Sequence, residues 1–96
     1  MASINIAVMA KVSHEINEER FRQEDLQSQG RFAHTCADPD VDEGYKLGVL
    51  VEEIGEVGRA LMEKMGKIGD RHNKDLRKEL IQVAAVAQAW AEALSV

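Results

Sequence analysis

The stretch LVEEIGEVGRAL, residues 50–61, decides the fold of this chain. Its apolar residues belong to a series that recurs at steps of three and four, which is the spacing of an amphipathic α-helix. The same stretch carries Glu52, Glu53 and Glu56 close together, although neighbouring carboxylates repel one another. We therefore expect a helix over residues 42–65 that has an apolar seam along one side and a dense group of acidic residues.

Residues before this stretch predict a first helix and a connection. Val12, Ile16 and Leu26 are spaced loosely for one helical face, and the surrounding sequence is rich in Glu, Gln and Arg, which indicates a helix over residues 8–29. The only proline, Pro39, lies in HTCADPDVDEG, where Asp, Gly and Pro cluster. Such clusters are typical of turns, so we expect this segment to connect the first two helices.

Residues after it predict a third helix. The segment GKIGDRHN, residues 66–73, contains two glycines and an Asn, so we expect it to break the helix. Asn73 or Asp75 can then cap the start of the third helix. From residue 76 to residue 94 apolar side chains alternate steps of four and three, the spacing of a helix that packs lengthwise against others.

The third helix is apolar on most of its sides. In IQVAAVAQAWAEAL, residues 81–94, only Gln82, Gln88 and Glu92 are polar. A helix of this kind is buried on most sides, and three helices from one chain are too few to cover it. We therefore predict an all-α fold, in which residues 1–96 form a single helical domain of three main helices and a homo-oligomer completes the bundle.

Composition limits the class of protein. The 96 residues carry 17 acidic and 12 basic side chains, a formal charge of −5, which argues against a nucleic-acid binder that works by neutralising phosphates. Cys36 is the only cysteine, so a reducing, cytoplasmic setting is expected. The early run INIAVMA has no basic residue before it and is short for a signal-peptide core. No apolar run approaches the roughly 20 residues of a membrane-spanning helix.

The acidic residues form a pattern that occurs twice. Helical geometry places a second stripe beside the apolar seam of the second helix, and an equivalent stripe lies at the same offset on the third helix. The stripes are Val49, Glu53, Glu56 and Ala60 on one helix, and Asp75, Glu79, Gln82 and Val86 on the other. Because apolar residues adjoin the polar ones in both, we expect the stripes to be partly buried and to face each other.

Partly buried carboxylates of this kind need a cation. Side chains at i and i+3 reach the same ion from neighbouring turns of one helical face. Oxygen ligands without His or Cys suit Mg²⁺ or Mn²⁺, and Mg²⁺ commonly binds substrate phosphates as well. The alternative is an ordinary solvated, Glu-rich helix surface. A di-iron bundle ranks far behind, because its usual Glu-x-x-His motif occurs on neither helix.

These motifs resemble those of a known family. EEIGEV at residues 52–57, followed by KELIQV at residues 78–83, is similar to the EExxE and ExxD pair of the MazG-like, all-α nucleoside triphosphate pyrophosphohydrolases. Over residues 15–94 the chain also resembles a small single-domain subtype found in phage and mobile gene cassettes. The segments that carry this likeness are EERFRQ at residues 18–23 and QVAAVAQAW at residues 82–90.

The resemblance implies an activity and an assembly. Members of this family hydrolyse a nucleoside triphosphate between its α and β phosphates, which releases a monophosphate and pyrophosphate and requires Mg²⁺. It therefore implies a (d)NTP substrate, a homo-oligomer that is a dimer or a dimer of dimers, and a role in cleaning the nucleotide pool. The alternative is a non-catalytic oligomerisation or adaptor module, in which the acidic stripe serves only as a protein interface.

The resemblance also assigns roles in the chemical step. Glu53 and Glu56 match the first pair of metal ligands, and Glu79 matches the third. Gln82 stands where the family has Asp, and its amide oxygen can coordinate without supplying charge. Glu52, the leading acid of the motif, matches a group behind the metal ligands or a base that acts through water. Catalytic roles are thus expected for Glu52 and Glu53.

Substrate-binding residues are expected at two places. Lys74 and Lys78 lie nearest the carboxylate stripe among the basic residues and are candidates for the terminal phosphates. In EERFRQ, Phe21 is a candidate for stacking on the base and Gln23 for hydrogen bonding to it. The subtype usually has a Trp-Gly pair soon after the RQ, where this chain has EDLQSQG.

Overall fold

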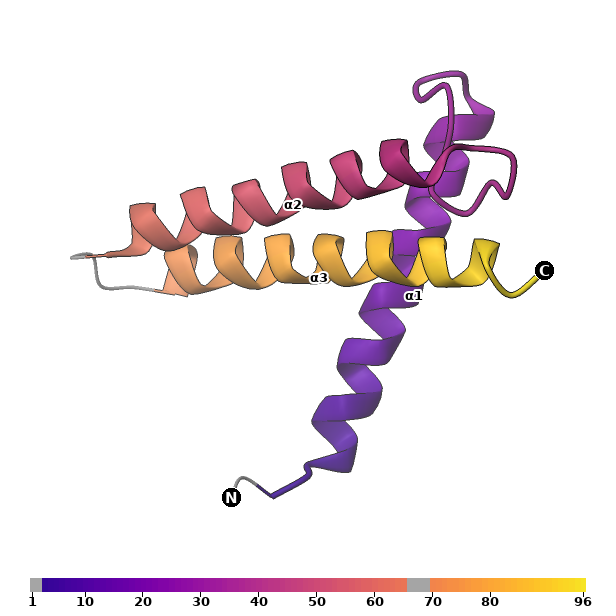
Figure 1. Ribbon diagram of the computed structural model, residues 1–96. Helices are drawn as coiled ribbons and strands as arrows, with labels where there is room; N and C mark the ends of the chain where they lie inside the picture. The colour runs from indigo at the N-terminus through magenta and orange to yellow at the C-terminus, as the bar shows by residue number, and fades with distance from the viewer. Residues whose placement is uncertain (1–2, 66–69) are drawn as a thin grey trace.

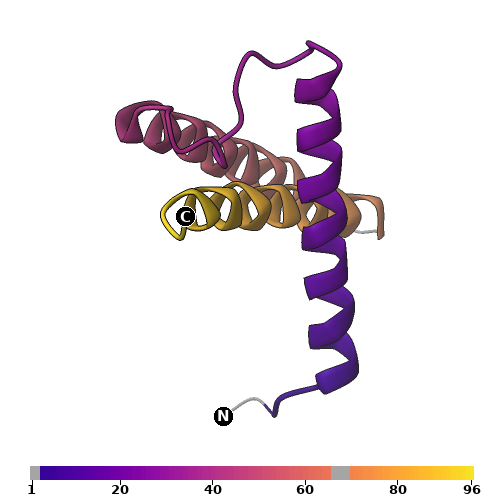
Figure 2. The same cartoon turned by 90° about the vertical axis from the view of Figure 1, so that its right-hand side faces the viewer.

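Three helices make up the part of the chain that is described. The structure is a computed structural model that describes residues 3–65 and 70–96, and within them it contains helices and no strand. The helices are α1 (Ile6–Ser28), α2 (Glu43–Lys64) and α3 (Asp70–Ala93). α2 and α3 lie side by side and antiparallel, while α1 crosses α3 steeply (Figure 1 and Figure 2). The predicted all-α class is therefore confirmed.

Both ends of α1 follow from local sequence. The side chain of Asn5 caps the first turn, because its Oδ1 accepts a hydrogen bond of 3.1 Å from the backbone N–H of Val8. At the other end Gly30 adopts a φ of 77°, which only glycine takes up without strain. The N–H groups of Gly30 and Arg31 then bond to the carbonyls of Gln27 and Leu26, a Schellman motif that ends the helix.

The third helix begins earlier than predicted. The expected break over residues 66–73 is wrong for its second half, because α3 already starts at Asp70, and residues 66–69 lie outside the described part. Asn73 and Asp75 are consequently within the helix and do not cap it. The reason is that Gly69 is the last strong helix breaker, and the sequence after it is compatible with a helix.

Small side chains make up most of the buried apolar positions of α2 and α3. Ala85, Ala89 and Ala93 of α3 are buried, as is Ala60 of α2, and small side chains of this kind permit close approach of neighbouring helices. Cys36, from the connection between α1 and α2, completes this core against α3. α3 therefore contacts both other helices and carries the core of the molecule.

Only part of the apolar seam of α2 is buried: Leu50 packs against the core of Cys36, Val86 and Ala89, and Val57 is half-buried. Leu47, Ile54 and Leu61 are 52%, 52% and 47% exposed, whereas Val49 is half-buried and Ala60 is buried. α2 thus presents the neighbouring stripe to α3, because that stripe ends in the alanine that lets the backbones approach. Partial burial of this stripe is confirmed, while Leu47, Ile54 and Leu61 of the seam remain about half exposed in the single chain.

Ion pairs fasten α1 to α3. Arg20 of α1 is only 8% exposed and donates two hydrogen bonds, of 3.0 and 2.8 Å, to the carboxylate of Glu92 in α3. Arg77 of α3 pairs with Glu15 of α1 further along the same crossing. The crossing is therefore polar and specific, unlike the alanine-rich interface between α2 and α3.

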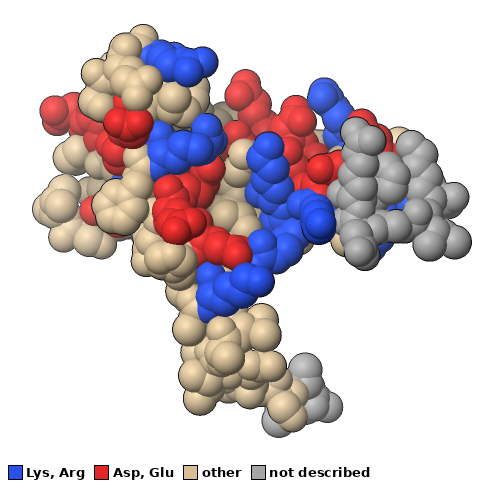
Figure 3. Space-filling view, turned by 180° about the vertical axis from the view of Figure 1, so that it is seen from behind, with Lys and Arg blue, Asp and Glu red and all other residues tan. Residues whose placement is uncertain are grey.

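The N-terminal part of α1 extends beyond the other helices. Figure 1 and Figure 2 show it projecting from the pair of α2 and α3. Residues 3–10 carry no charged side chain, and in Figure 3 the projecting part is almost entirely uncharged. Ile6, Val8 and Met9 are exposed there. Among the described residues, no helix is long and apolar enough to cross a membrane.

Candidate functional site

A pocket of about 410 Å³ lies where the end of α1, the connection and the facing sides of α2 and α3 meet. Figure 3 shows acidic and basic side chains gathered across the middle of one face of the molecule. The pocket combines both signs of charge with aromatic and apolar residues. Its walls are thus built from every element of the fold.

Local structure places two of the wall residues. Arg31 follows directly on the glycine that ends α1, so the turn at Gly30 directs the chain and its arginine to the pocket. Cys36 is 6% exposed and packs against Val86 and Ala89 of α3, which holds the connection against the core. The connection therefore forms a fixed wall of the pocket.

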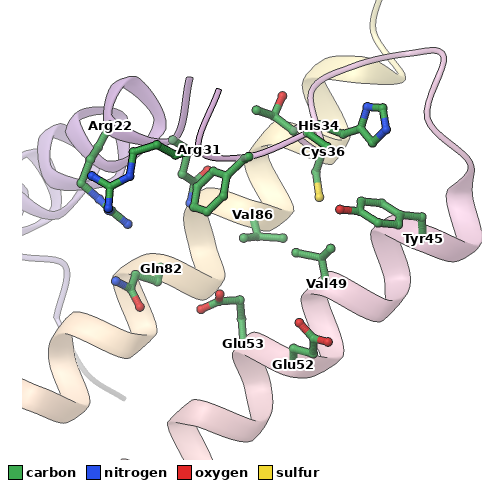
Figure 4. Close-up of a pocket in the computed structure, with 14 residues that line it drawn as sticks. Arg22, Arg31, His34, Cys36, Tyr45, Val49, Glu52, Glu53, Gln82 and Val86 are labelled. Carbon is green, nitrogen blue, oxygen red and sulfur yellow. The ribbon is translucent and has the colours of Figure 1, made fainter. Parts of the chain in front are cut away.

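The pocket has two chemically different ends (Figure 4). Arg22 and Arg31 lie at one end, with Gln82 nearby. The other end contains Cys36 with His34 and Tyr45, whose rings meet edge to face at a centroid distance of 6.1 Å. We call these the arginine end and the ring end. Glu52 and Glu53 line the α2 side between them.

Glu53 is the electrostatic centre of the acidic group. Its pKa is raised above the ordinary value first by burial and then by the negative charges of Glu79 and Glu56, with smaller effects from Glu19 and Glu52. Carboxylates from all three helices therefore repel one another around one side chain. Such a group is poised to gain a proton or a cation.

The acidic group continues from the pocket along the interface of α2 and α3. Glu56 and Glu79 line a second, polar pocket of about 240 Å³, together with Asp75 and Lys78. Arg59 pairs with Glu56 at 3.5 Å and neutralises part of this charge. The Oε2 atom of Glu79 is buried and makes no hydrogen bond within the described residues. A buried carboxylate oxygen without a partner is costly, so it favours a cation there.

The predicted site residues fall into three groups. Those that line the larger pocket are Glu52, Glu53, Gln82 and Gln23. Those that line the second pocket are Glu56, Glu79 and Lys78. Phe21, which is 76% exposed, and Lys74, which is also exposed, line neither of these two pockets.

The oxygen ligands expected for Mg²⁺ fit this region by their chemistry. Glu53, Glu56, Glu79 and Gln82 occupy facing stripes of α2 and α3, and they offer only hard oxygen donors. Within the described residues, no three acidic, His or Cys side chains are already arranged around one point that suits an ion. Binding of an ion therefore requires these side chains to rotate toward one point, and the buried Oε2 of Glu79 has no hydrogen bond within the described residues that this would break.

Sequence reasoning missed several residues of the pocket. Phe21 and Gln23 were both expected to contact the nucleobase. Residues two positions apart on a helix differ by about 200° in direction, so these two cannot line the same wall. Gln23 and its neighbour Arg22 line the pocket, and Tyr45 and Cys36 form its ring end. The helical angle would have signalled Arg22, whereas no sequence signal indicated that the connection folds back over α2.

Comparison of the chain with protein-family models, with curated proteins and with solved structures found no significant match. The resemblance of its two acidic motifs to the MazG-like enzymes therefore stays a prediction. The geometry of the pocket is the basis for a functional proposal.

Proposed function

We propose that this protein is a Mg²⁺-dependent nucleoside triphosphate pyrophosphohydrolase that converts a (d)NTP into a (d)NMP and pyrophosphate. One observation carries the proposal. The acidic stripes of α2 and α3 meet a pocket that has arginines at one end and aromatic rings at the other. Carboxylates suit a metal ion, arginines suit phosphate oxygens and rings suit a nucleobase, so the three together match a metal-bound nucleotide.

Metal ligands in the proposal are Glu53, Glu56, Glu79 and Gln82. Mg²⁺ bound to them would neutralise phosphate charge and polarise the phosphorus that is attacked, and Mn²⁺ has the same preference for oxygen ligands. These residues supply three carboxylates and one neutral amide oxygen. Burial and then the neighbouring carboxylates raise the pKa of Glu53, and a cation among these carboxylates would reduce their repulsion.

Glu52 has a separate role in the proposal. It lines the pocket beside Glu53, and its side chain is exposed to solvent. Its carboxylate accepts a proton from a water molecule as the water oxygen forms a bond to phosphorus. The bond between that phosphorus and the bridging oxygen breaks, and the pyrophosphate leaves with the bond's electron pair. The resemblance supports attack at the link between the α and β phosphates.

A homo-oligomer is part of the same proposal. The uncovered seam of α2 and the projecting start of α1 support the view that a second copy covers them. We place the protein in the cytoplasm, as a dimer or a dimer of dimers that acts on the nucleotide pool and not on nucleic acid.

The test is to incubate the protein with Mg²⁺ and a panel of ribo- and deoxynucleoside triphosphates, and to detect pyrophosphate and monophosphate. Glu53→Gln removes one charged ligand, and Glu18→Gln makes the same chemical change at an exposed position of α1. Wild type and Glu18→Gln should release pyrophosphate, and Glu53→Gln should lose at least about 100-fold in rate, the scale of a group that supports the transition state.

The alternative is an oligomerisation or adaptor module. The exposed apolar seam of α2 is the observation that favours it, because such a face suits a protein partner. This alternative predicts a well-folded oligomer in which neither wild type nor variant releases pyrophosphate from any triphosphate of the panel.

A further inference from the structure

The segment EERFRQ contains two arginines whose side chains are used differently. Arg20 is buried and has no free nitrogen: Nε and Nη2 donate to Glu92, and Nη1 donates to Glu24 at 2.9 Å. All three of its nitrogens are occupied within the protein. Arg20 is therefore a structural residue that fastens α1 to α3.

Arg22 has its terminal nitrogens free. Its Nε donates to both carboxylate oxygens of Glu19, at 2.6 and 2.9 Å, and within the described residues neither Nη1 nor Nη2 donates a hydrogen bond. Glu19 is only 10% exposed, so it is a fixed anchor, while Arg22 is 53% exposed and lines the pocket. The protein thus holds the base of the guanidinium and leaves its fork available to a ligand.

The surroundings of that fork indicate what it binds. Arg31 lies at the same end of the pocket, so a ligand bound there can meet two guanidinium groups (Figure 4). Arg22 also interacts electrostatically with the carboxylate of Glu53, although no hydrogen bond joins them. A ligand that carries both phosphate oxygens and a cation complements the arginines and the acidic group at once. The planar fork matches phosphate oxygens in pairs.

The direction of the pocket fixes which phosphates reach the arginines. Tyr45 at the ring end and Glu53 stand eight residues apart on α2, a rise of about 12 Å along the helix. A base at the ring end therefore points its phosphate chain along α2 toward Glu53 and then toward Arg22. The phosphates furthest from the base reach the arginines.

We infer that Arg22, held in place by Glu19, binds the β and γ phosphates of the substrate and makes the site selective for triphosphates over monophosphates. This inference rests on the proposed function, because it assumes that a nucleotide occupies the pocket. The inference assigns this phosphate contact to Arg22, which lines the larger pocket, whereas Lys74 lines neither of the two pockets.

The experiment measures binding without turnover. Calorimetry with Mg²⁺ present compares the α,β-methylene analogues of ATP and CTP, which cannot be cleaved between those phosphates, with AMP and CMP. The variants are Arg22→Gln, Arg22→Lys, Glu19→Gln and, as control, Lys11→Gln, which removes the same charge from an exposed position of α1. Thermal melting and pyrophosphate release are recorded for each.

Arg22→Gln should weaken binding of the triphosphate analogues roughly 10- to 100-fold, the scale of charge-assisted hydrogen bonds, and change monophosphate binding less than about twofold. Arg22→Lys and Glu19→Gln should give smaller losses, because one keeps the charge without the fork and the other releases the fork. Lys11→Gln should match wild type. A merely structural role for Arg22 would lower binding of both classes together.

Each contrary result has a definite meaning. If Arg22→Gln binds the analogues as Lys11→Gln does, or loses monophosphate binding equally, the inference is overturned. If wild type binds the analogues selectively through Arg22 but releases no pyrophosphate from true triphosphates, the inference stands and the proposed hydrolysis fails. If wild type binds no analogue, the inference is overturned, and if it also releases no pyrophosphate from any triphosphate of the panel, the proposed function is overturned with it.

Discussion

Glu53 shows at the scale of one residue how a site lowers the stability of the fold around it. Burial and the neighbouring carboxylates raise its pKa in the folded protein above the unfolded value. The folded state therefore holds this proton more tightly, so stability falls as the pH rises through the raised pKa. Near neutral pH the ionised Glu53 opposes folding when no cation is present.

Replacement of Glu53 by Gln should therefore stabilise the metal-free protein. We expect Glu53→Gln to raise the melting temperature at pH 7 by about 2–4 °C, the shift that accompanies about 0.5 kcal/mol in a domain of this size. The difference from wild type should shrink toward pH 4, where the carboxylate is protonated. Thermal melts in EDTA at both pH values measure this, and a lower melting temperature for the variant at pH 7 would contradict it.

Addition of Mg²⁺ should make wild type more stable than Glu53→Gln, the reverse of the order expected without metal. An ion that binds only the folded state stabilises it by about 2.7 kcal/mol when present at 100 times its dissociation constant. Mg²⁺ should therefore raise the melting temperature of wild type and of Glu18→Gln, and should raise that of Glu53→Gln much less. Equal shifts for all three proteins would place the binding of Mg²⁺ elsewhere.

Lys46 is the most buried large side chain of the described residues and has little to compensate its charge. It is 0% exposed, and its Nζ makes no hydrogen bond within them. The nearest carboxylate oxygen, on Glu43, is 3.8 Å away, and the other oxygen of Glu43 accepts a hydrogen bond from the indole of Trp90. A buried charge with so weak a partner costs free energy.

The change Lys46→Met should therefore increase stability. Met has a similar length and no charge, so we expect a gain of about 1 kcal/mol or more in the free energy of unfolding. Urea denaturation measures it, with Lys64→Met at the end of α2 as a control expected within about 0.5 kcal/mol of wild type. A loss of stability in Lys46→Met would show that the ammonium finds a stronger partner in solution.

At the scale of elements, the attachment of α1 depends on Arg20. Its hydrogen bond lowers the pKa of Glu92 and joins residues 72 positions apart in the sequence. Arg20→Met should cost about 1.5–3 kcal/mol, the value of hydrogen bonds to a charged group. Urea denaturation at pH 7 tests this against Arg59→Met, an exposed arginine whose loss should cost less than about 0.5 kcal/mol.

The same pair gives a pH dependence. Because the folded pKa of Glu92 lies below its unfolded value, its contribution is complete above the unfolded value and is lost as the pH falls through the lowered pKa. Arg20→Met should therefore lose less stability on acidification than wild type does. Parallel loss in both proteins between pH 5 and pH 3 would contradict this assignment.

The helices and their facing stripes were predictable, because both depend on local periodicity. Spacing alone indicated that Glu53 and Glu79 lie on partly buried stripes, and the structure confirms that both side chains are partly buried. The crossing of α1 was not predictable, because the pairing of Arg20 with Glu92 depends on the folded arrangement of the helices and not on sequence spacing. The wall of the pocket around Cys36 was missed for the same reason: a connection has no period that would predict its path.

At the scale of the whole molecule, the single chain leaves a continuous apolar surface uncovered. Leu47, Val51, Ile54 and Leu61 lie on one side of α2 at steps of four, three and seven, which is a coiled-coil seam, and all are about half exposed. Gly58 occupies the seam position four residues after Ile54. A Cβ added there would meet nothing within 4 Å in the single chain. A glycine in a helix costs about 1 kcal/mol relative to alanine, and the open space beside Gly58 would allow the backbone of a second chain to approach closely.

A second copy of the chain should therefore cover this seam, and Ile54 should be central to the contact. We expect light scattering at micromolar concentration to show a dimer or tetramer for wild type and a monomer for Ile54→Lys, with Leu94→Lys, at an exposed apolar residue beyond the end of α3, as the control. The melting temperature of wild type should rise with protein concentration, because association stabilises the folded state by mass action, and that of Ile54→Lys should not. A monomeric wild type would contradict the assembly, while an unchanged oligomer in Ile54→Lys would assign it to the projecting start of α1, whose exposed Ile6 and Met9 form the other uncovered apolar surface.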